Sequence, residues 1–210
     1  MSDNSQIFFN KKILIYGLGK SGLSSFNFLK DKNEVYLFDD NFSLKINKSF
    51  KKKILKFKEL LNIKFDLIIL SPGIDKKKCK LKNLLKKKNK DIYTDLDVFY
   101  AFNKNISITI TGTNGKSTTC KLLYDIFKDQ KKDVRLVGNI GTPILSIKKI
   151  SKKTIFVIEA SSYQLEYSKI FSSKFAAILN IAPDHLERHG NLNNYIKAKF
   201  KIFNNQKRGA

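Results

Sequence analysis

The segment from residue 111 to residue 118 has the residue types of a phosphate-binding loop. In such a loop backbone N–H groups surround phosphate oxygens, a lysine neutralises the β and γ phosphates, and a hydroxyl binds Mg²⁺. The first glycine of the usual motif would stand at Ile110, and Gly112 is present instead, so this is a shorter variant. The residues expected to contact a nucleoside triphosphate are Gly112, Thr113, Asn114, Gly115, Lys116, Ser117 and Thr118.

A triphosphate site also needs a carboxylate for the metal ion at a neighbouring strand end. Glu159 follows an apolar run at 154–158 and can hold Mg²⁺ opposite Ser117. The next apolar run leads into a loop that contains His185 and His189, the only two histidines of the chain. For this pair a ligand or acid–base role and a packing role are both open.

A glycine-rich loop stands near the start of the chain, at Gly17-Leu18-Gly19-Lys20-Ser21-Gly22. It follows an apolar run and opens a helical stretch, which is the context that the G-x-G-x-x-G pattern requires. Asp39 comes 17 residues after Gly22 and can accept hydrogen bonds from a ribose or a base. The loop indicates a dinucleotide or nucleotide-diphosphate site, with a turn kept only for packing as the alternative. By itself it does not choose NAD over another diphosphate.

Short apolar runs alternate with helical stretches along the whole chain, and each motif follows the end of such a run. The runs at 13–16, 34–38, 67–70, 92–93, 106–110, 134–137, 154–158 and 176–180 are predicted strands. The stretches at 21–30, 80–88, 95–103 and 117–129 are predicted helices. This alternation predicts an α/β fold with parallel sheets, in which ligands bind at the carboxyl ends of the strands. Because the pattern restarts near Lys104, we expect a Rossmann-like domain over 1–103 and part of a P-loop-type domain over 104–210.

The composition favours an ordinary globular protein. The chain has 210 residues, of which 42% are hydrophobic, and a formal net charge of +23. Only Arg135, Arg188 and Arg208 among its 41 basic residues are arginine, which is the residue preferred for bidentate contacts to bases and phosphates. Lysine, asparagine, isoleucine and phenylalanine share A/T-rich codons, so base composition explains the charge and we expect no nucleic-acid partner.

The apolar runs are too short to cross a membrane, and no basic region leads into an apolar stretch at the start. We therefore expect no membrane partner and a cytoplasmic location. Cys79 and Cys120 are expected to be reduced thiols.

Six motifs together resemble the Mur ligase family of bacterial cell-wall synthesis. Four of them stand in order at 112–118, 138–141, 159–166 and 180–190, and the other two are 17–22 and 71–74. The similarity covers nearly the whole chain and is strongest to the member that joins D-glutamate to UDP-N-acetylmuramoyl-L-alanine in peptidoglycan biosynthesis. It implies that ATP phosphorylates the terminal carboxylate of this UDP substrate and that the amine of D-glutamate attacks the acyl phosphate. The first loop would then bind UDP rather than NAD.

The resemblance also assigns residues. It places catalytic roles on Lys116, His185 and Lys199. The metal ligands that it implies are Ser117, Glu159, His185 and Lys199, the last as a carbamate. The residues expected at the UDP substrate are Gly17, Leu18, Gly19, Ser21, Gly22, Asp39, Ser71, Pro72, Gly73, Asn139, Ser161 and Gln164. Composition alone would make Lys199 a solvated helix lysine, which is the alternative.

Family members are longer and have three domains. We therefore expect that the sequence ends within the ATP-binding domain, that the C-terminal domain for D-glutamate is absent, and that this polypeptide alone is inactive as a ligase. Four other functions are open. They are another ATP-dependent amide ligase such as a folylpolyglutamate synthase, an NAD-dependent dehydrogenase, a non-catalytic nucleotide-binding module and, least favoured, a nucleic-acid binder.

Overall fold

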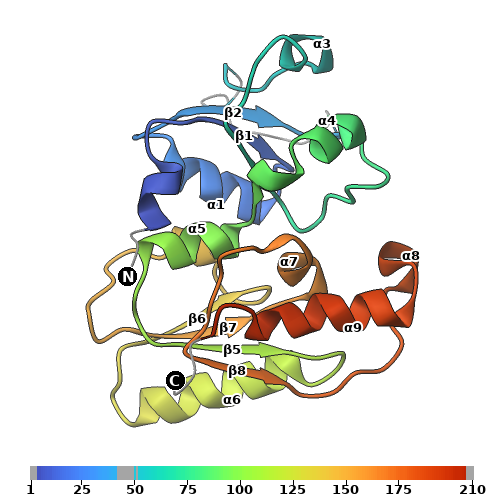
Figure 1. Ribbon diagram of the computed structural model, residues 1–210. Coiled ribbons are helices and arrows are strands. Elements are labelled where there is room, and N and C mark those ends of the chain that lie inside the picture. The colour runs from blue at the N-terminus through green and yellow to red at the C-terminus, as the bar shows by residue number, and fades with distance from the viewer. Residues whose placement is uncertain (1–3, 42–49, 51, 207–210) are drawn as a thin grey trace.

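Two four-stranded parallel sheets lie at the centre of the protein (Figure 1). The structure is a computed structural model that describes residues 4–41, 50 and 52–206. The first sheet has the order β2-β1-β3-β4, with β1 at Lys12–Tyr16, β2 at Glu34–Phe38, β3 at Leu67–Leu70 and β4 at Ile92–Tyr93. The second has the order β6-β7-β5-β8, with β5 at Ser107–Thr111, β6 at Val134–Gly138, β7 at Ile155–Glu159 and β8 at Phe175–Ile178. The predicted α/β fold with parallel sheets is confirmed.

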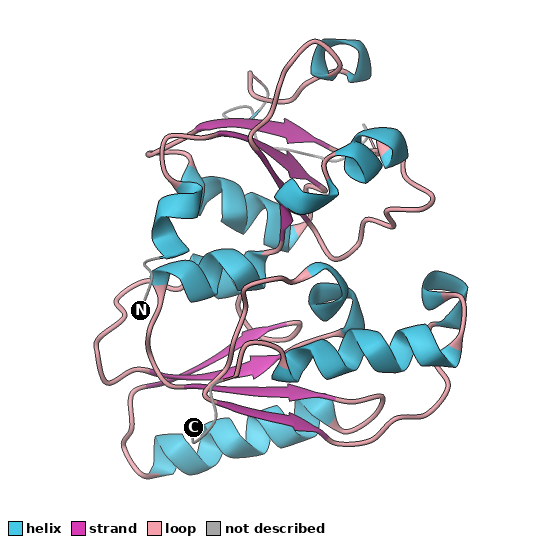
Figure 2. Ribbon diagram, in the orientation of Figure 1, coloured by secondary structure: helices cyan, strands magenta, loops and turns pink. Residues whose placement is uncertain are grey.

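Helices lie on both sides of each sheet (Figure 2). Around the first sheet are η1 (Asn4–Phe8), α1 (Lys20–Leu29), α3 (Phe57–Leu60), α4 (Lys82–Lys87), η2 (Asn89–Asp91) and α5 (Asp95–Phe102). Around the second are α6 (Lys116–Asp129), η3 (Ile144–Ser146), α7 (Ser162–Tyr167), α8 (Leu186–His189), α9 (Leu192–Phe200) and η4 (Lys201–Phe203). Because both faces are covered, a central strand such as β3 is apolar and buried throughout. No helix in the described ranges is long and apolar enough to cross a membrane.

The parallel registers bring the motif-bearing loops together at one edge of each sheet. In the first sheet Tyr16 pairs with both Phe38 and Leu70, so the loops after β1, β2 and β3 begin at the same level. In the second sheet Ile110 pairs with Glu159 on one side and with Ala177 of β8 on the other. The predicted P-loop and the predicted metal carboxylate therefore lie side by side.

Helix α5 packs between the two sheets (Figure 1). Its Phe99 meets Phe156 of β7 edge to face, with ring centroids 4.9 Å apart, and one apolar cluster includes side chains from both sheets. The first sheet ends before α5 and the second begins after it. A domain boundary near Lys104 stays a prediction.

The buried carboxylate of Asp97 joins α5 to the segment that precedes β8. One oxygen accepts hydrogen bonds from the Ser168 hydroxyl and from the backbone N–H groups of residues 169–171, at 2.8–3.0 Å. The other oxygen accepts from the backbone N–H and the hydroxyl of Thr94, the residue that caps α5. Asp97 is fully buried, so its negative charge is balanced by donors rather than by water.

We predict that Asp97→Ala lowers the free energy of unfolding by about 3 kcal/mol or more, because it leaves several buried donors without an acceptor. The exposed Asp129 at the end of α6 is the matched control, and its replacement by alanine should change stability by less than about 0.5 kcal/mol. Urea unfolding of both variants measures the difference. A loss below about 1 kcal/mol for Asp97→Ala would show that the two sheets do not depend on this carboxylate.

Candidate functional site

The loop between β5 and α6 has the geometry of an anion-binding site. Helix α6 begins directly after Gly115, whose φ of 80° lies in the left-handed region, and backbone N–H groups at its first turn face the loop. The Lys116 Nζ folds back onto the loop and donates to the carbonyls of Gly112 and Thr113, at 2.9 and 2.8 Å. Asn180 holds the loop from the side, because its amide exchanges two hydrogen bonds with the backbone of Asn114.

Glu159 connects this loop to the turn after β6. One carboxylate oxygen accepts from the Ser117 hydroxyl at 2.7 Å, and the other accepts from the Asn139 side-chain amide at 2.7 Å. The carboxylate is buried, with 1% of the residue exposed. Gly138 makes this approach possible, since its φ is 108° and an added Cβ would lie 2.3 Å from the Glu159 carbonyl oxygen. The structure thus brings together three predicted residues that come from three strand ends.

The Ser117–Glu159 pair fits a hard divalent cation. Magnesium is held in nucleotide sites by one or two hydroxyl or carboxylate oxygens, together with phosphate oxygens and water. Among the described residues, no group of three or more His, Cys, Asp or Glu side chains is close enough to hold a metal without a ligand.

Lys199 on α9 is one of the most buried polar side chains, with 1% of the residue exposed. Its Nζ donates to the Gly112 carbonyl at 2.7 Å, the same oxygen that accepts from Lys116. Burial lowers the pKa of Lys199 to about 8, and the charge of Lys116 adds to the effect. The alternative that Lys199 is a solvated helix lysine is wrong, because α9 lies against α7 and turns this side chain toward the P-loop.

The two histidines have different surroundings. His189 is buried and its Nε2 lies 3.1 Å from the Ser162 hydroxyl, and burial lowers its pKa. This supports packing for His189. His185 stands before α8 with a left-handed φ of 53°, and nearly half of its side chain is exposed. Its ring lies beside that of Tyr163, with ring centroids 5.0 Å apart. No described contact joins His185 to Ser117 or Glu159.

The glycine-rich loop after β1 is braced by residues from two neighbouring strand ends. The Leu18 N–H donates to the Asp39 carboxylate at 2.6 Å, and the Ser71 hydroxyl donates to the Gly17 carbonyl at 2.7 Å. An added Cβ on Gly22 would lie 1.8 Å from the Gly17 carbonyl oxygen, so only glycine allows α1 to begin here. Asp39 and Ser71, both predicted to lie near uridine, thus hold the loop in shape.

A pocket of about 380 Å³ is lined by loops of both sheets. Its lining includes Lys20, Ser21 and Pro72 from the first sheet's loops and Asn139 and Gln164 from the second's. Gln164 and Ser161 also form the capping box that starts α7, so part of their hydrogen-bonding capacity is used within the protein. The lining does not include the other residues predicted at the UDP substrate, which are Gly17, Leu18, Gly19, Gly22, Asp39, Ser71, Gly73 and Ser161. It also includes neither Glu159 nor any residue of the loop at 112–118.

Sequence reasoning missed Asp95, which also lines this pocket. It is buried at the start of α5 and accepts hydrogen bonds from the Ser21 hydroxyl and the Leu96 N–H. Burial raises the pKa of its carboxyl group. Its position just after the carboxyl end of the predicted strand at 92–93 is the signal that could identify it.

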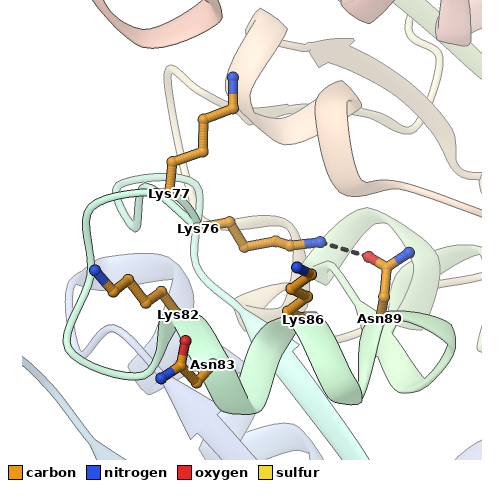
Figure 3. A pocket seen from close by; sticks show the side chains of 6 residues that line it. All are labelled: Lys76, Lys77, Lys82, Asn83, Lys86 and Asn89. Atoms are coloured by element: carbon orange, nitrogen blue, oxygen red, sulfur yellow. Dashed lines mark hydrogen bonds between the residues drawn. The ribbon is translucent and has the colours of Figure 1, made fainter.

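A second hollow, of about 480 Å³, lies beside α4 and contains none of the predicted site residues (Figure 3). Its lining consists of Lys76, Lys77, Lys82, Asn83, Lys86 and Asn89. A single hydrogen bond joins two of them, from the Lys76 Nζ to the Asn89 side chain. The other lysine side chains in the figure spread apart rather than converge on one point.

Two family models match the chain. The model described as Mur ligase MurD-like, N-terminal domain, matches residues 11–92, and the Mur ligase middle domain matches residues 110–210. The chain belongs to the Mur ligase family. The first match covers the glycine-rich loop and the second covers the P-loop, Glu159 and Lys199.

Curated relatives of this Mur ligase chain include proteins named UDP-N-acetylmuramoylalanine–D-glutamate ligase. The one from Caldicellulosiruptor saccharolyticus is 40% identical over 94% of the chain and 46% of the relative. The one from Clostridioides difficile is 37% identical over 93% of the chain and 46% of the relative. The chain thus spans about half the length of the curated relatives that it matches.

Solved structures of Mur ligases share the fold. The UDP-N-acetylmuramate:L-alanyl-γ-D-glutamyl-meso-diaminopimelate ligase of Neisseria meningitidis matches with a TM-score of 0.57 and 16% identity, over 92% of this chain and 67% of that one. The UDP-N-acetylmuramate–alanine ligase of Thermotoga maritima gives a TM-score of 0.52 and 21% identity, over 92% and 47%.

Proposed function

We propose that this chain contributes the UDP-substrate site and the ATP site of a ligase that joins D-glutamate to UDP-N-acetylmuramoyl-L-alanine. The observation that carries the proposal is the pocket between the sheets. It places Ser21 and Pro72 of the diphosphate-type loops opposite Asn139, whose amide is bonded to the predicted metal carboxylate Glu159. This pocket would hold the part of the substrate between its diphosphate, at the glycine-rich loop, and its carboxylate, near Asn139. The names of the curated relatives support the choice of amino acid.

The residues of the chain would have separate tasks in this reaction. When bound, ATP supplies the phosphoryl group for the substrate carboxylate, and Mg²⁺ offsets the charge on its phosphates. Ser117 and Glu159 would hold the metal ion, and Lys116 would leave the loop carbonyls to contact the phosphates. Asn139 would orient the substrate carboxylate, and His185 would provide a ligand for a second metal ion. D-Glutamate is the amine partner, and we assign no residue of this chain to its binding.

The alternatives explain less of the structure. An NAD-dependent dehydrogenase leaves the Ser117–Glu159 pair and the P-loop without a role. A folylpolyglutamate synthase does not account for the match of residues 11–92 to a MurD-like N-terminal domain. A non-catalytic module that only binds nucleotides would also account for both loops. A measurement of phosphoryl transfer distinguishes such a module from a ligase.

Calorimetric titration of the purified chain tests the two sites separately. We expect saturable binding of UDP-N-acetylmuramoyl-L-alanine and of UDP but not of NAD, and binding of a non-hydrolysable ATP analogue with Mg²⁺. Lys116→Ala should weaken binding of the ATP analogue by about 10- to 100-fold and leave UDP binding unchanged, because one charge-assisted contact to phosphate is lost.

Lys121→Ala, an exposed lysine on the same helix, is the control and should bind the ATP analogue as the unchanged chain does. Binding of NAD in place of the UDP ligands, or an unchanged affinity of Lys116→Ala for the ATP analogue, would contradict the proposal.

The environment of Lys199 supports its proposed carbamylation. A neutral amine is needed to attack carbon dioxide: the N–C bond forms, a C=O electron pair moves to oxygen, and a proton leaves to solvent. With a pKa of about 8, about half of the Lys199 amines are neutral at pH 8, whereas less than about 1% of ordinary lysines are. The carbamate would replace a buried cation beside Lys116 by an anion that can support a metal ion.

We predict a carbamate carbonyl resonance of Lys199 in ¹³C spectra recorded with labelled bicarbonate, beside the one that the α-amino group gives because its ordinary pKa is also near 8. The intensity of the Lys199 resonance should rise between pH 7 and pH 8.5, because raising the pH through the pKa of Lys199 releases the proton that blocks the amine. Lys199→Met should remove the resonance, and Lys197→Met, at an exposed position of the same helix, should keep it. If Lys199→Met loses no resonance relative to the unchanged chain, the assignment is refuted.

A further inference from the structure

Arg188 on α8 joins the second sheet's His185 loop to the first sheet's Ser71–Gly73 turn. Its terminal Nη2 donates to the carbonyl of Ile74 at 2.8 Å and to that of Pro72 at 3.3 Å. These partners are more than one hundred residues away in the sequence. The side chain is 8% exposed, so the two hydrogen bonds are shielded from water.

The guanidinium is fixed from the other side by α7. Its Nε lies 3.6 Å from a carboxylate oxygen of Glu166, an ion pair beyond hydrogen-bond distance, and both atoms are buried without another partner. Its Cζ lies 4.7 Å from the ring centre of Tyr163 and 5.9 Å from that of Tyr167. A planar cation held by a carboxylate and two rings has little freedom to move away from the carbonyls.

These contacts form a continuous path from the glycine-rich loop to His185, the residue proposed as a ligand of a second metal ion. Ser71 donates to the Gly17 carbonyl in the glycine-rich loop, and the Ile74 N–H donates to the Ser71 carbonyl. At the other end of the path, the Arg188 N–H donates to the carbonyl of His185, whose ring also packs near Tyr163. Movement of the Pro72–Ile74 turn on binding a uridine diphosphate would therefore be transmitted to His185.

We propose that Arg188 is a positioning residue that couples occupancy of the uridine-diphosphate side of the site to occupancy of the metal–nucleotide side. The inference rests on the proposed function. This coupling role differs from a role in stability alone. A residue that only stabilises the fold does not change how one bound ligand alters the affinity for the other. Coupling is reciprocal, so either ligand can serve as the effector.

The test measures the affinity of the chain for a non-hydrolysable ATP analogue with Mg²⁺, without and with saturating UDP-N-acetylmuramoyl-L-alanine. In the unchanged chain the ratio of the two dissociation constants should depart from one by about fivefold or more, in the range typical of coupled sites. Arg188→Lys keeps the charge but loses the planar fork, and should move the ratio at least threefold toward one. Glu166→Gln keeps the arginine but weakens its anchor, and should move the ratio in the same direction.

Lys78→Ala is the matched control. Its Nζ also crosses between the two halves, to the Glu187 carbonyl at 3.5 Å, but it is exposed and should leave the ratio unchanged. Melting temperatures identify variants that are merely destabilised, and Glu166→Gln provides the reading if Arg188→Lys does not fold. An unchanged ratio in the folded variants, or a ratio of one in the unchanged chain when both ligands bind, overturns the inference. Failure of the unchanged chain to bind either ligand instead contradicts the proposed function.

Discussion

The buried carboxylate of Asp97 fixes how the two sheets face one another. Carboxylates are costly to bury, and this one is stable because backbone and hydroxyl donors from both sides of the molecule converge on it. Helix α5 is consequently held between the sheets, and its first residue, Asp95, is brought to the pocket where loops of both sheets meet. Together with the apolar cluster shared by both sheets, this contact holds the loops of the two sheets beside one pocket.

Glu159 connects the loop after β5 to the turn after β6. Its two oxygens are shared between the P-loop hydroxyl of Ser117 and the amide of Asn139, so one side chain sets the distance between the nucleotide side and the substrate side. Two lysines, Lys116 and Lys199, converge on a single carbonyl of Gly112 in the same loop. Burial, and after it the charge of Lys116, lowers the pKa of Lys199, which favours the neutral amine that carbamylation needs.

The parts of the site that sequence predicted are those whose chemistry is local. The glycine loops and Glu159 stand at ends of apolar runs, and the parallel-sheet rule then places them together. The contacts that Asp97 and Arg188 make with the other half of the molecule could not be predicted, because those partners lie more than seventy residues away and are mostly backbone groups. The short helices α7 and α8 have too few residues for a periodic pattern. The burial of Lys199 depends on how α9 packs against α7. In a lysine-rich sequence no local pattern distinguishes this lysine from the exposed ones.

The proposed function requires that the UDP substrate runs from the glycine-rich loop through the pocket between the sheets, with its carboxylate toward the metal–nucleotide side. Paramagnetic broadening tests it directly, with Mn²⁺ in place of Mg²⁺ beside the non-hydrolysable ATP analogue and UDP-N-acetylmuramoyl-L-alanine bound to the same chain. The account predicts strong broadening of the L-alanine methyl protons and much weaker broadening of the uracil protons. Equal broadening of both groups, or stronger broadening of uracil, would contradict it.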